Sequence, residues 1–180
     1  MVRDGIIKTF LKRFLFFFRN RCIKIRYLRL RNKKISIISN NCIGGYLYNN
    51  FGCKFLSPTI NLQIEPEDFV KFCNNITSYL NENIVEQKNY DPAGFKALGG
   101  SDIDFPVGKL KDIIIYFQHY TTFKEGYDKW NERKERINME NLFFILCDTY
   151  CDGKTVCKKE TIDMFLNIPY KNKLFVTDNK

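Results

Sequence analysis

The sequence lacks an apolar run near the roughly 20 residues that a membrane-spanning helix needs. It also lacks a cleavable signal ahead of its cysteines, and the seven cysteines are odd in number and scattered along the chain. A disulfide framework is therefore not expected, and a reducing cytoplasm fits this cysteine usage best. With 44% hydrophobic and 27% charged residues over 180 positions, the composition predicts a globular protein of one domain rather than a disordered chain.

Acidic residues are nearly absent from the first 34 positions, where twelve Lys or Arg accompany Asp4 alone. The formal charge of +9 therefore divides into +11 for this arm and −2 for the remainder. We predict a basic N-terminal arm at 1–34 followed by a single domain at 35–180. Because the nearly neutral domain offers neither a second basic stripe nor a recognisable reader motif, nucleic acid is not expected as a partner.

Apolar residues in the arm recur at spacings of three and four, as Ile6, Phe10, Phe14 and Phe18 illustrate. This period predicts an amphipathic helix. A Phe-rich stripe flanked by Lys and Arg is typical of a helix in a membrane interface, where each basic residue contributes about 1 kcal/mol near anionic lipid. We expect the arm to bind the inner face of the membrane. A helix packed on the domain is the alternative that the pattern leaves open.

The rest of the chain alternates short β-rich runs with amphipathic stretches. Strands are predicted at 35–39, 55–59, 112–118, 142–147 and 173–176, and helices at 46–51, 66–80, 122–138 and 158–166, with a loop at 87–104. This alternation predicts an α/β fold of three layers around a mainly parallel, open, Rossmann-like sheet. The run at 112–118 is continuously apolar, so we expect it to be a central strand buried on both faces.

Three residues at predicted strand ends form a candidate catalytic group, because ligands of open parallel sheets bind beyond the carboxyl ends of the strands. Cys42 follows the first strand at the start of a helix, where unpaired N–H groups and the helix dipole favour a thiolate. His119 is the only histidine and follows the central strand, and Asp148 follows the next one. We predict a nucleophile, a base and an orienting carboxylate in that order. Buried, turn-forming or capping roles are the competing interpretation for each.

Polar, aromatic and glycine residues near these strand ends are predicted to bind the substrate: Asn40, Asn41, Gly44, Gly45, Tyr120, Trp130 and Arg133. The two glycines would let a substrate oxygen approach the helix amides, as an oxyanion hole or a phosphate cradle requires. A nucleotide-phosphate or sugar-binding turn remains open, although the dinucleotide and P-loop patterns are missing. The cysteines at 147, 151 and 157 match no standard zinc spacing, so no metal is expected, and the sequence leaves the identity of any cofactor open.

Five blocks in order carry a resemblance to a known family: Ser39 to Gly45, Leu56 to Thr59, Tyr116 to Tyr120, Lys129 to Arg133, and Pro169 to Lys173. Together they resemble the bacterial domain of unknown function 1919 family, from about Ile35 to Thr177. The family supplies no catalytic residue set, so the site residues named above rest on the sequence pattern alone.

The resemblance implies a protein of exopolysaccharide, capsule or surface-glycan gene clusters. Its expected function is a transferase of acyl or glycosyl groups near the membrane, with a glycan or lipid-linked glycan as acceptor. A noncatalytic accessory or binding protein of a capsule cluster is the alternative. The resemblance also implies that similar proteins continue past the final strand, so this chain looks truncated at its C-terminus.

Overall fold

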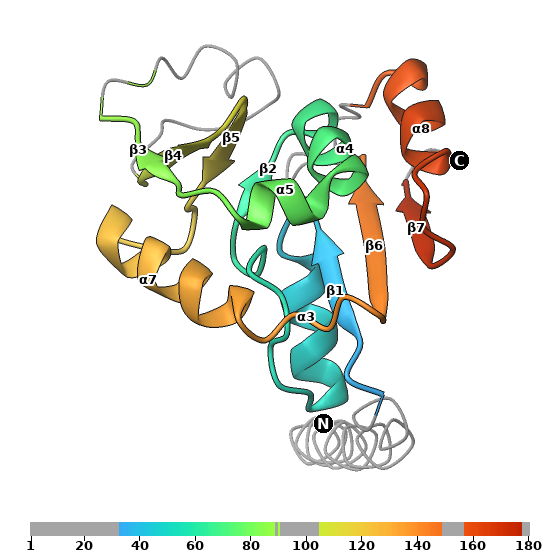
Figure 1. Ribbon diagram of the computed structural model, residues 1–180, viewed down its shortest axis with the longest axis horizontal. Coiled ribbons are helices and arrows are strands. Elements are labelled where there is room, and N and C mark those ends of the chain that lie inside the picture. Colours follow the sequence, from blue (N-terminus) through green and yellow to red (C-terminus); the bar gives the residue numbers. More distant parts are fainter. Residues whose placement is uncertain (1–32, 89, 91–104, 149–156, 178–180) are drawn as a thin grey trace, which may run out of the picture.

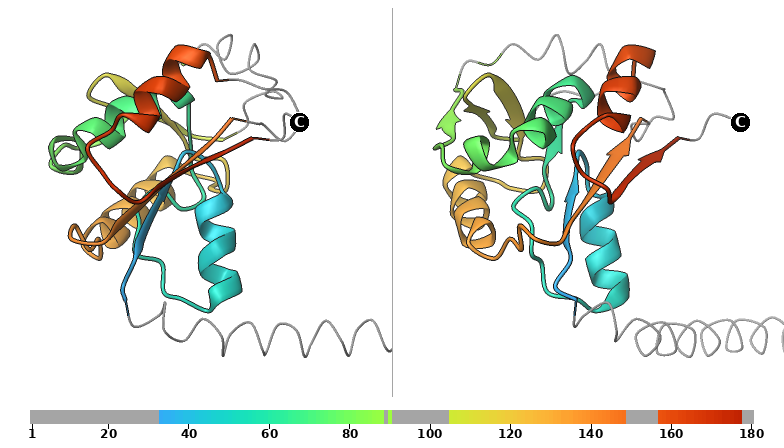
Figure 2. Two further views of the ribbon diagram at one scale, coloured as in Figure 1. Left: turned by 90° about the vertical axis from the view of Figure 1, so that its right-hand side faces the viewer. Right: turned by 45° about the vertical axis from the view of Figure 1, so that its right-hand side comes forward.

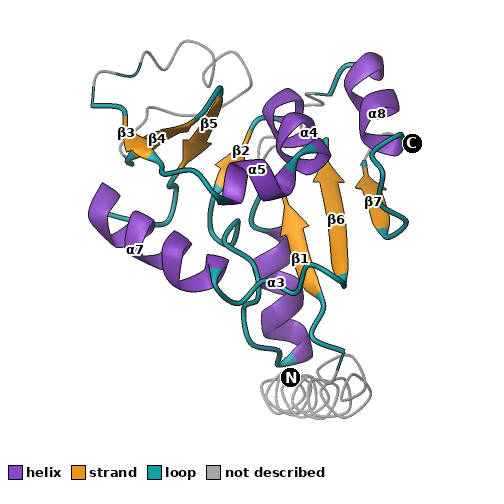
Figure 3. Cartoon of the chain, in the orientation of Figure 1, coloured by secondary structure: helices purple, strands orange, loops and turns teal. Residues whose placement is uncertain are grey.

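The computed structural model describes residues 33–88, 90, 105–148 and 157–177 (Figure 1). All but the last two residues of the predicted basic arm lie outside these ranges. The strands are β1 (Ser36–Ser39), β2 (Gln63–Ile64), β3 (Val85–Glu86), β4 (Val107–Leu110), β5 (Ile113–Tyr116), β6 (Leu142–Cys147) and β7 (Lys173–Val176). The helices are α3 (Ile43–Phe51), α4 (Pro66–Asn74), α5 (Ile76–Leu80), α7 (Phe123–Lys134) and α8 (Lys159–Leu166) (Figure 3). The mixed helix and strand content predicted from the sequence is confirmed, whereas the strands form one parallel and one antiparallel sheet instead of a single mainly parallel sheet.

A parallel sheet of three strands in the order β1-β6-β7 forms one half of the fold. In its register Ser36 lies opposite Leu142, and Phe144 lies opposite Lys173. Helix α3 covers one face of this sheet, while α4 and α8 lie on the other (Figure 2). The carboxyl end of β1 leads directly into α3, so the turn between them lies at the edge where the sequence predicts a site.

A second sheet is antiparallel, with the strand order β2-β5-β4-β3. The prediction that 112–118 forms the centre of a parallel sheet is therefore wrong: β5 pairs antiparallel with β4 and β2. A continuous apolar run predicts burial on both faces but not the direction of pairing. Here β4 and β5 are joined by a tight turn in which Lys111 has a φ of 55°, and the Val107–Leu110 strand contains a glycine that masks its β character.

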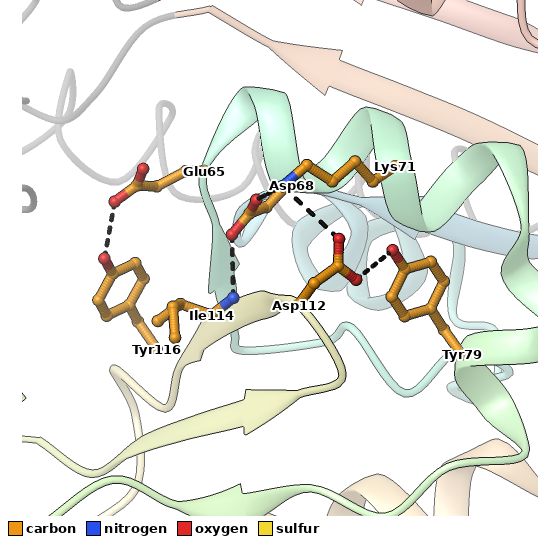
Figure 4. Close-up of polar contacts among 7 residues, drawn as sticks. All are labelled: Glu65, Asp68, Lys71, Tyr79, Asp112, Ile114 and Tyr116. Carbon is orange, nitrogen blue, oxygen red and sulfur yellow. Dashed lines mark hydrogen bonds and ion pairs between the residues drawn. The ribbon is translucent and has the colours of Figure 1, made fainter.

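Polar contacts hold helices α4 and α5 against the β4–β5 hairpin (Figure 4). Asp68 on α4 accepts a hydrogen bond from the backbone N–H of Ile114 at 3.0 Å and pairs with Lys71 at 2.8 Å. The hydroxyl of Tyr79 on α5 donates to Asp112 at 2.8 Å, which lowers the pKa of that carboxyl group. These contacts fix β5 in place, and with it the segment that follows β5.

A partly buried acid and two tyrosines form a second connection between α4 and the hairpin. The hydroxyl of Tyr116 donates to Glu65 at 2.7 Å, and the hydroxyls of Tyr90 and Tyr116 lie 2.7 Å apart. Burial raises the pKa of Glu65 and that of Tyr116, because the charged form of each loses hydration. Glu65 therefore binds a proton more tightly in the fold than in water.

One hydrophobic core joins the two sheets. Buried side chains from the parallel sheet, such as Ile38 and Phe144, belong to the same cluster as Ile115 from the antiparallel sheet. Trp130 on α7 is fully buried in this cluster, with its ring edge-on to Phe72 at 6.2 Å between centroids. Because the core is continuous, the ends of β1 and β5 are held in a fixed relation to each other.

Candidate functional site

The thiol of Cys42 and the ring of His119 meet in the structure, with 3.0 Å between Sγ and Nε2. Cys42 is the N-cap residue of α3, and its carbonyl accepts from the N–H of Tyr46 at 3.2 Å. His119 lies in the turn between β5 and α7, which is closed by a bond from the N–H of Tyr120 to the carbonyl of Phe117 at 3.0 Å. Cys42 is partly buried and His119 is exposed, so a solute can reach the pair.

The sequence predicts that Cys42 and His119 lie close together, but the strands that position them differ from those predicted. We expected both residues at the ends of neighbouring strands in one parallel sheet. Instead Cys42 follows a strand of the parallel sheet, and His119 follows a strand of the antiparallel sheet. The two segments are brought together because β2 contacts both: Ile64 donates its N–H to the carbonyl of Asn40 at 2.9 Å, and β2 pairs with β5 (Figure 1).

The first turn of α3 differs from the predicted substrate cradle. Gly44 and Gly45 lie inside the helix rather than before it, since α3 begins at Ile43. The N–H of Ile43 donates to Asn41 Oδ1 at 3.0 Å, and the N–H of Gly44 donates to Ser39 Oγ at 3.2 Å. Two of the amides that could have faced a substrate oxygen are therefore occupied by side chains of the same turn.

A buried hydroxyl network supports this turn. The hydroxyl of Ser39 donates to the carbonyl of Asn41 at 2.8 Å, while its backbone N–H donates to Thr59 Oγ1 at 3.2 Å. Thr59 in turn lies 3.0 Å from the hydroxyl of Ser57, and Ser39, Ser57 and Thr59 are all fully buried. Because each hydroxyl is paired away from water, the network restricts the turn that carries Cys42 to one conformation.

Asn40 has a structural role at the end of β1. Its side-chain amide donates to the carbonyl of Cys147 at 3.0 Å and accepts from the N–H of the same residue at 2.9 Å. These reciprocal bonds extend the pairing of β1 with β6 by one residue. The amide is nearly buried, so its hydrogen bonds are made to protein rather than offered to a substrate.

Asp148 is 1% exposed and follows β6, as the sequence predicts. Its backbone N–H donates to the carbonyl of Val176 at 3.0 Å. Burial, followed by the charges of Asp148 and Cys147, raises the pKa of Cys157 to about 12. These contacts connect Asp148 with the β7 side of the sheet, and its role in orienting His119 stays a prediction.

The aromatic and basic residues predicted to bind substrate lie mostly inside the protein. Arg133 is 8% exposed, and its Nη1 donates to the carbonyl of Ile60 at 2.8 Å and to the hydroxyl of Tyr120 at 2.9 Å. Its guanidinium lies 5.3 Å from the centroid of the Phe55 ring. Trp130 is wholly buried, so its ring packs in the core and presents no binding surface. Arg133 and Tyr120 instead connect α7 with the segment that precedes β2.

Two glutamines, one on β2 and one next to His119 in the chain, were not predicted from the sequence. The side chain of Gln118, the residue before His119, donates from Nε2 to Gln63 Oε1 at 2.5 Å. Gln63 is 5% exposed, and its own Nε2 is buried without a hydrogen-bond partner among the described residues. A polar residue between the apolar Leu62 and Ile64 is the signal that could have identified this position.

No cluster of three His, Cys, Asp or Glu residues suitable for a metal ion occurs within 33–88, 105–148 and 157–177. None of the helices in the same ranges is long and apolar enough to cross a membrane. The described residues bring together a thiol and an imidazole.

Comparison with known proteins gives two matches. Residues 14–180 match the family described as Domain of unknown function (DUF1919). A protein of Haemophilus influenzae, described as an uncharacterized protein, is 33% identical over 161 residues, which make up 89% of this chain and 68% of that protein. The match therefore includes both the segment that carries Cys42 and the segment that carries His119.

Proposed function

We propose that this chain, which belongs to the Domain of unknown function (DUF1919) family, is a transferase that carries an acyl group on Cys42. The observation that carries the proposal is the 3.0 Å contact between Cys42 Sγ and His119 Nε2 at the start of a helix. A thiol with an imidazole in hydrogen-bond reach is the arrangement that activates cysteine for covalent catalysis. Cys42 is partly buried and His119 is exposed, so a substrate can reach both side chains.

In the proposed reaction His119 takes the proton of Cys42, and the thiolate attacks the carbonyl carbon of an activated ester or thioester. A bond forms between Sγ and that carbon, and the bond to the leaving group breaks. The leaving group departs with the electron pair of its bond to the carbonyl carbon and takes up the proton from His119. In the second half, a hydroxyl of the acceptor attacks the carbonyl carbon of the thioester, and its proton passes to His119. The new bond from oxygen to carbon replaces the bond from carbon to Sγ, and the departing thiolate takes the proton back from His119.

The groups that meet at the site favour acyl transfer over glycosyl transfer. Glycosidases with a covalent intermediate use two carboxylates about 5 Å apart. Here the reactive contact is between a sulfur and an imidazole nitrogen. A thioester is the ordinary product of an attack by a thiolate on an activated acyl group, so the site suits acyl chemistry.

The acceptor is proposed from the resemblance to proteins of surface-glycan clusters. We propose that a hydroxyl of a glycan or lipid-linked glycan receives the acyl group at the cytoplasmic face of the membrane. The basic residues of the arm at 1–34 support this placement through their charge, which attracts anionic lipid. A noncatalytic accessory role in the same clusters is the alternative, and the following experiment separates the two.

The test uses p-nitrophenyl acetate as an acyl donor and follows the protein by mass spectrometry and the release of p-nitrophenolate. We expect one acetyl group on the peptide that contains Cys42, none on that peptide in Cys42→Ser, and an acetylation rate about 100-fold lower in His119→Ala. Cys53→Ser is the matched control, because Cys53 is also half-buried but its sulfur contacts the carbonyl of Phe51. Equal acetylation of the wild type and Cys42→Ser would support the accessory role instead.

A further inference from the structure

An acyl transferase needs hydrogen-bond donors for the negative oxygen that develops when a carbonyl is attacked. The usual donors are backbone N–H groups at the start of the helix that bears the nucleophile. In this chain the N–H groups of Ile43 and Gly44 already donate to Asn41 and Ser39. These two N–H groups are therefore not available to the oxyanion, and a side-chain amide is another donor that can serve.

In the described part of the chain two buried side chains have a donor without a partner, Gln63 and Trp130, and of these Gln63 is hydrogen-bonded to Gln118, the residue before His119. The Nε2 of Gln63 has no hydrogen-bond partner among the residues that the structure describes, although the residue is only 5% exposed. A buried N–H group that stays unpaired costs about 1–3 kcal/mol. Such a group needs an explanation, and a hydrogen bond to a ligand during the reaction is one that fits a residue bonded to the His119 segment.

The position of Gln63 links it to both reactive residues. Strand β2 lies between β1 and β5 (Figure 1). The next residue, Ile64, donates to the carbonyl of Asn40, two residues before Cys42, at 2.9 Å. The Oε1 atom of Gln63 accepts from Gln118, the residue before His119. The same amide group therefore has its oxygen fixed by the His119 segment, which leaves the nitrogen to donate.

We propose that Gln63 Nε2 donates a hydrogen bond to the oxyanion formed when Cys42 attacks an acyl carbonyl, an inference that rests on the proposed function. As the bond from Sγ to the carbonyl carbon forms, the electrons of the carbonyl π bond move to its oxygen. Gln63 stabilises that charge until the electrons return and the leaving group is expelled. Gln63 is thus an oxyanion-stabilising residue of the site.

The test compares two reactions of the same thiol. Acetylation by p-nitrophenyl acetate passes through an oxyanion, whereas alkylation by iodoacetamide displaces iodide from carbon and forms none. In Gln63→Met, which is neutral and similar in length, we expect acetylation of Cys42 to slow on the order of 100-fold while alkylation keeps its wild-type rate. The matched control is Gln118→Met, which breaks the same glutamine–glutamine hydrogen bond but keeps the donor of Gln63, and should retain most of the acetylation rate.

Three results would overturn the inference. Acetylation at the wild-type rate in Gln63→Met would show that the donor is not used. An equal fall of acetylation and alkylation would assign Gln63 to folding of the site alone. An equal loss in Gln118→Met and Gln63→Met would assign the effect to the bond between the two glutamines. A wild-type protein that is not acetylated on Cys42 would instead refute the proposed function, so the two failures are distinguishable.

Discussion

Substituting Gly44 by alanine tests whether the turn below Cys42 is as tightly packed as the structure shows. A Cβ atom at position 44 would lie 2.6 Å from Ser39 Oγ, closer than side-chain atoms tolerate. The hydroxyl of Ser39 would have to rotate away. In doing so it would lose its bond from the N–H at position 44 and its bond to the carbonyl of Asn41.

The size of the effect follows from these two bonds. A buried polar group that loses its partner costs about 1–3 kcal/mol. Against this, alanine favours a helix over glycine by about 1 kcal/mol. We expect Gly44→Ala to lower the free energy of unfolding by about 2 kcal/mol, which corresponds to a melting temperature about 4–8 °C lower for a chain of this size.

A double-mutant cycle with Ser39→Ala isolates the steric contact. Once Ser39 Oγ is absent, the nearest atom of that residue to the new methyl group is its Cβ at 3.5 Å, an ordinary contact. Gly44→Ala should therefore be neutral or stabilising in the Ser39→Ala background. Thermal and urea denaturation of the four proteins provide the measurement. A loss of about 2 kcal/mol for Gly44→Ala in both backgrounds would refute the reasoning.

Three further predictions concern the acid, thiol and hairpin contacts. Because burial raises the pKa of Glu65 above its usual 4.5, the folded state holds a proton that the unfolded state releases, and stability falls as pH rises from about 4.5 through the raised value. Melting temperatures of Glu65→Gln should decline less over this range than those of the wild type, and parallel curves would contradict the assignment. Iodoacetamide should modify Cys42 long before Cys157, whose pKa of about 12 leaves about one thiol in ten thousand ionised at pH 8, and peptide mapping measures the order. Asp68→Ala should cost about 1–3 kcal/mol in urea denaturation, since it leaves a backbone N–H of β5 without its partner. Lys71→Ala should cost less than about 1 kcal/mol, because the side chain that pairs with Asp68 and Asp112 is half exposed. Equal losses would show that the ion pair with Asp68 dominates.

The elements of the parallel sheet were predictable because their sequences are locally unambiguous. The predicted strands at 142–147 and 173–176 agree with β6 and β7, and the first predicted strand contains β1. The antiparallel sheet was not predictable in the same way. The apolar run that contains β5 does not show whether the strand pairs in parallel or antiparallel. Its partner β4 is hard to recognise, because it is a short strand with a glycine and a lysine among its four residues.

Only part of the arrangement at the candidate site could be predicted. The chemical role of some residue types can be read from the sequence, whereas that of others depends on how the chain packs. Cys42 and His119 are chemically distinctive, so sequence position alone singles them out, and the structure brings them to 3.0 Å. The roles of Asn40 and Trp130 depend on burial, which is decided by the packing of distant elements. The role proposed for Gln63 rests on its unpaired Nε2 atom, and an unpaired atom can be recognised only when the hydrogen bonds around it are known.

Rescue of His119→Ala by free imidazole tests the central claim most directly. The ring of His119 is exposed, so its removal leaves a position that imidazole from solution can occupy beside the sulfur of Cys42. We predict that p-nitrophenyl acetate acylates Cys42 slowly in this variant and that added imidazole restores the rate, with no such effect when Cys42 is replaced by serine. Acylation of Cys42 in His119→Ala at the wild-type rate without imidazole would contradict the claim that the two residues act as a pair.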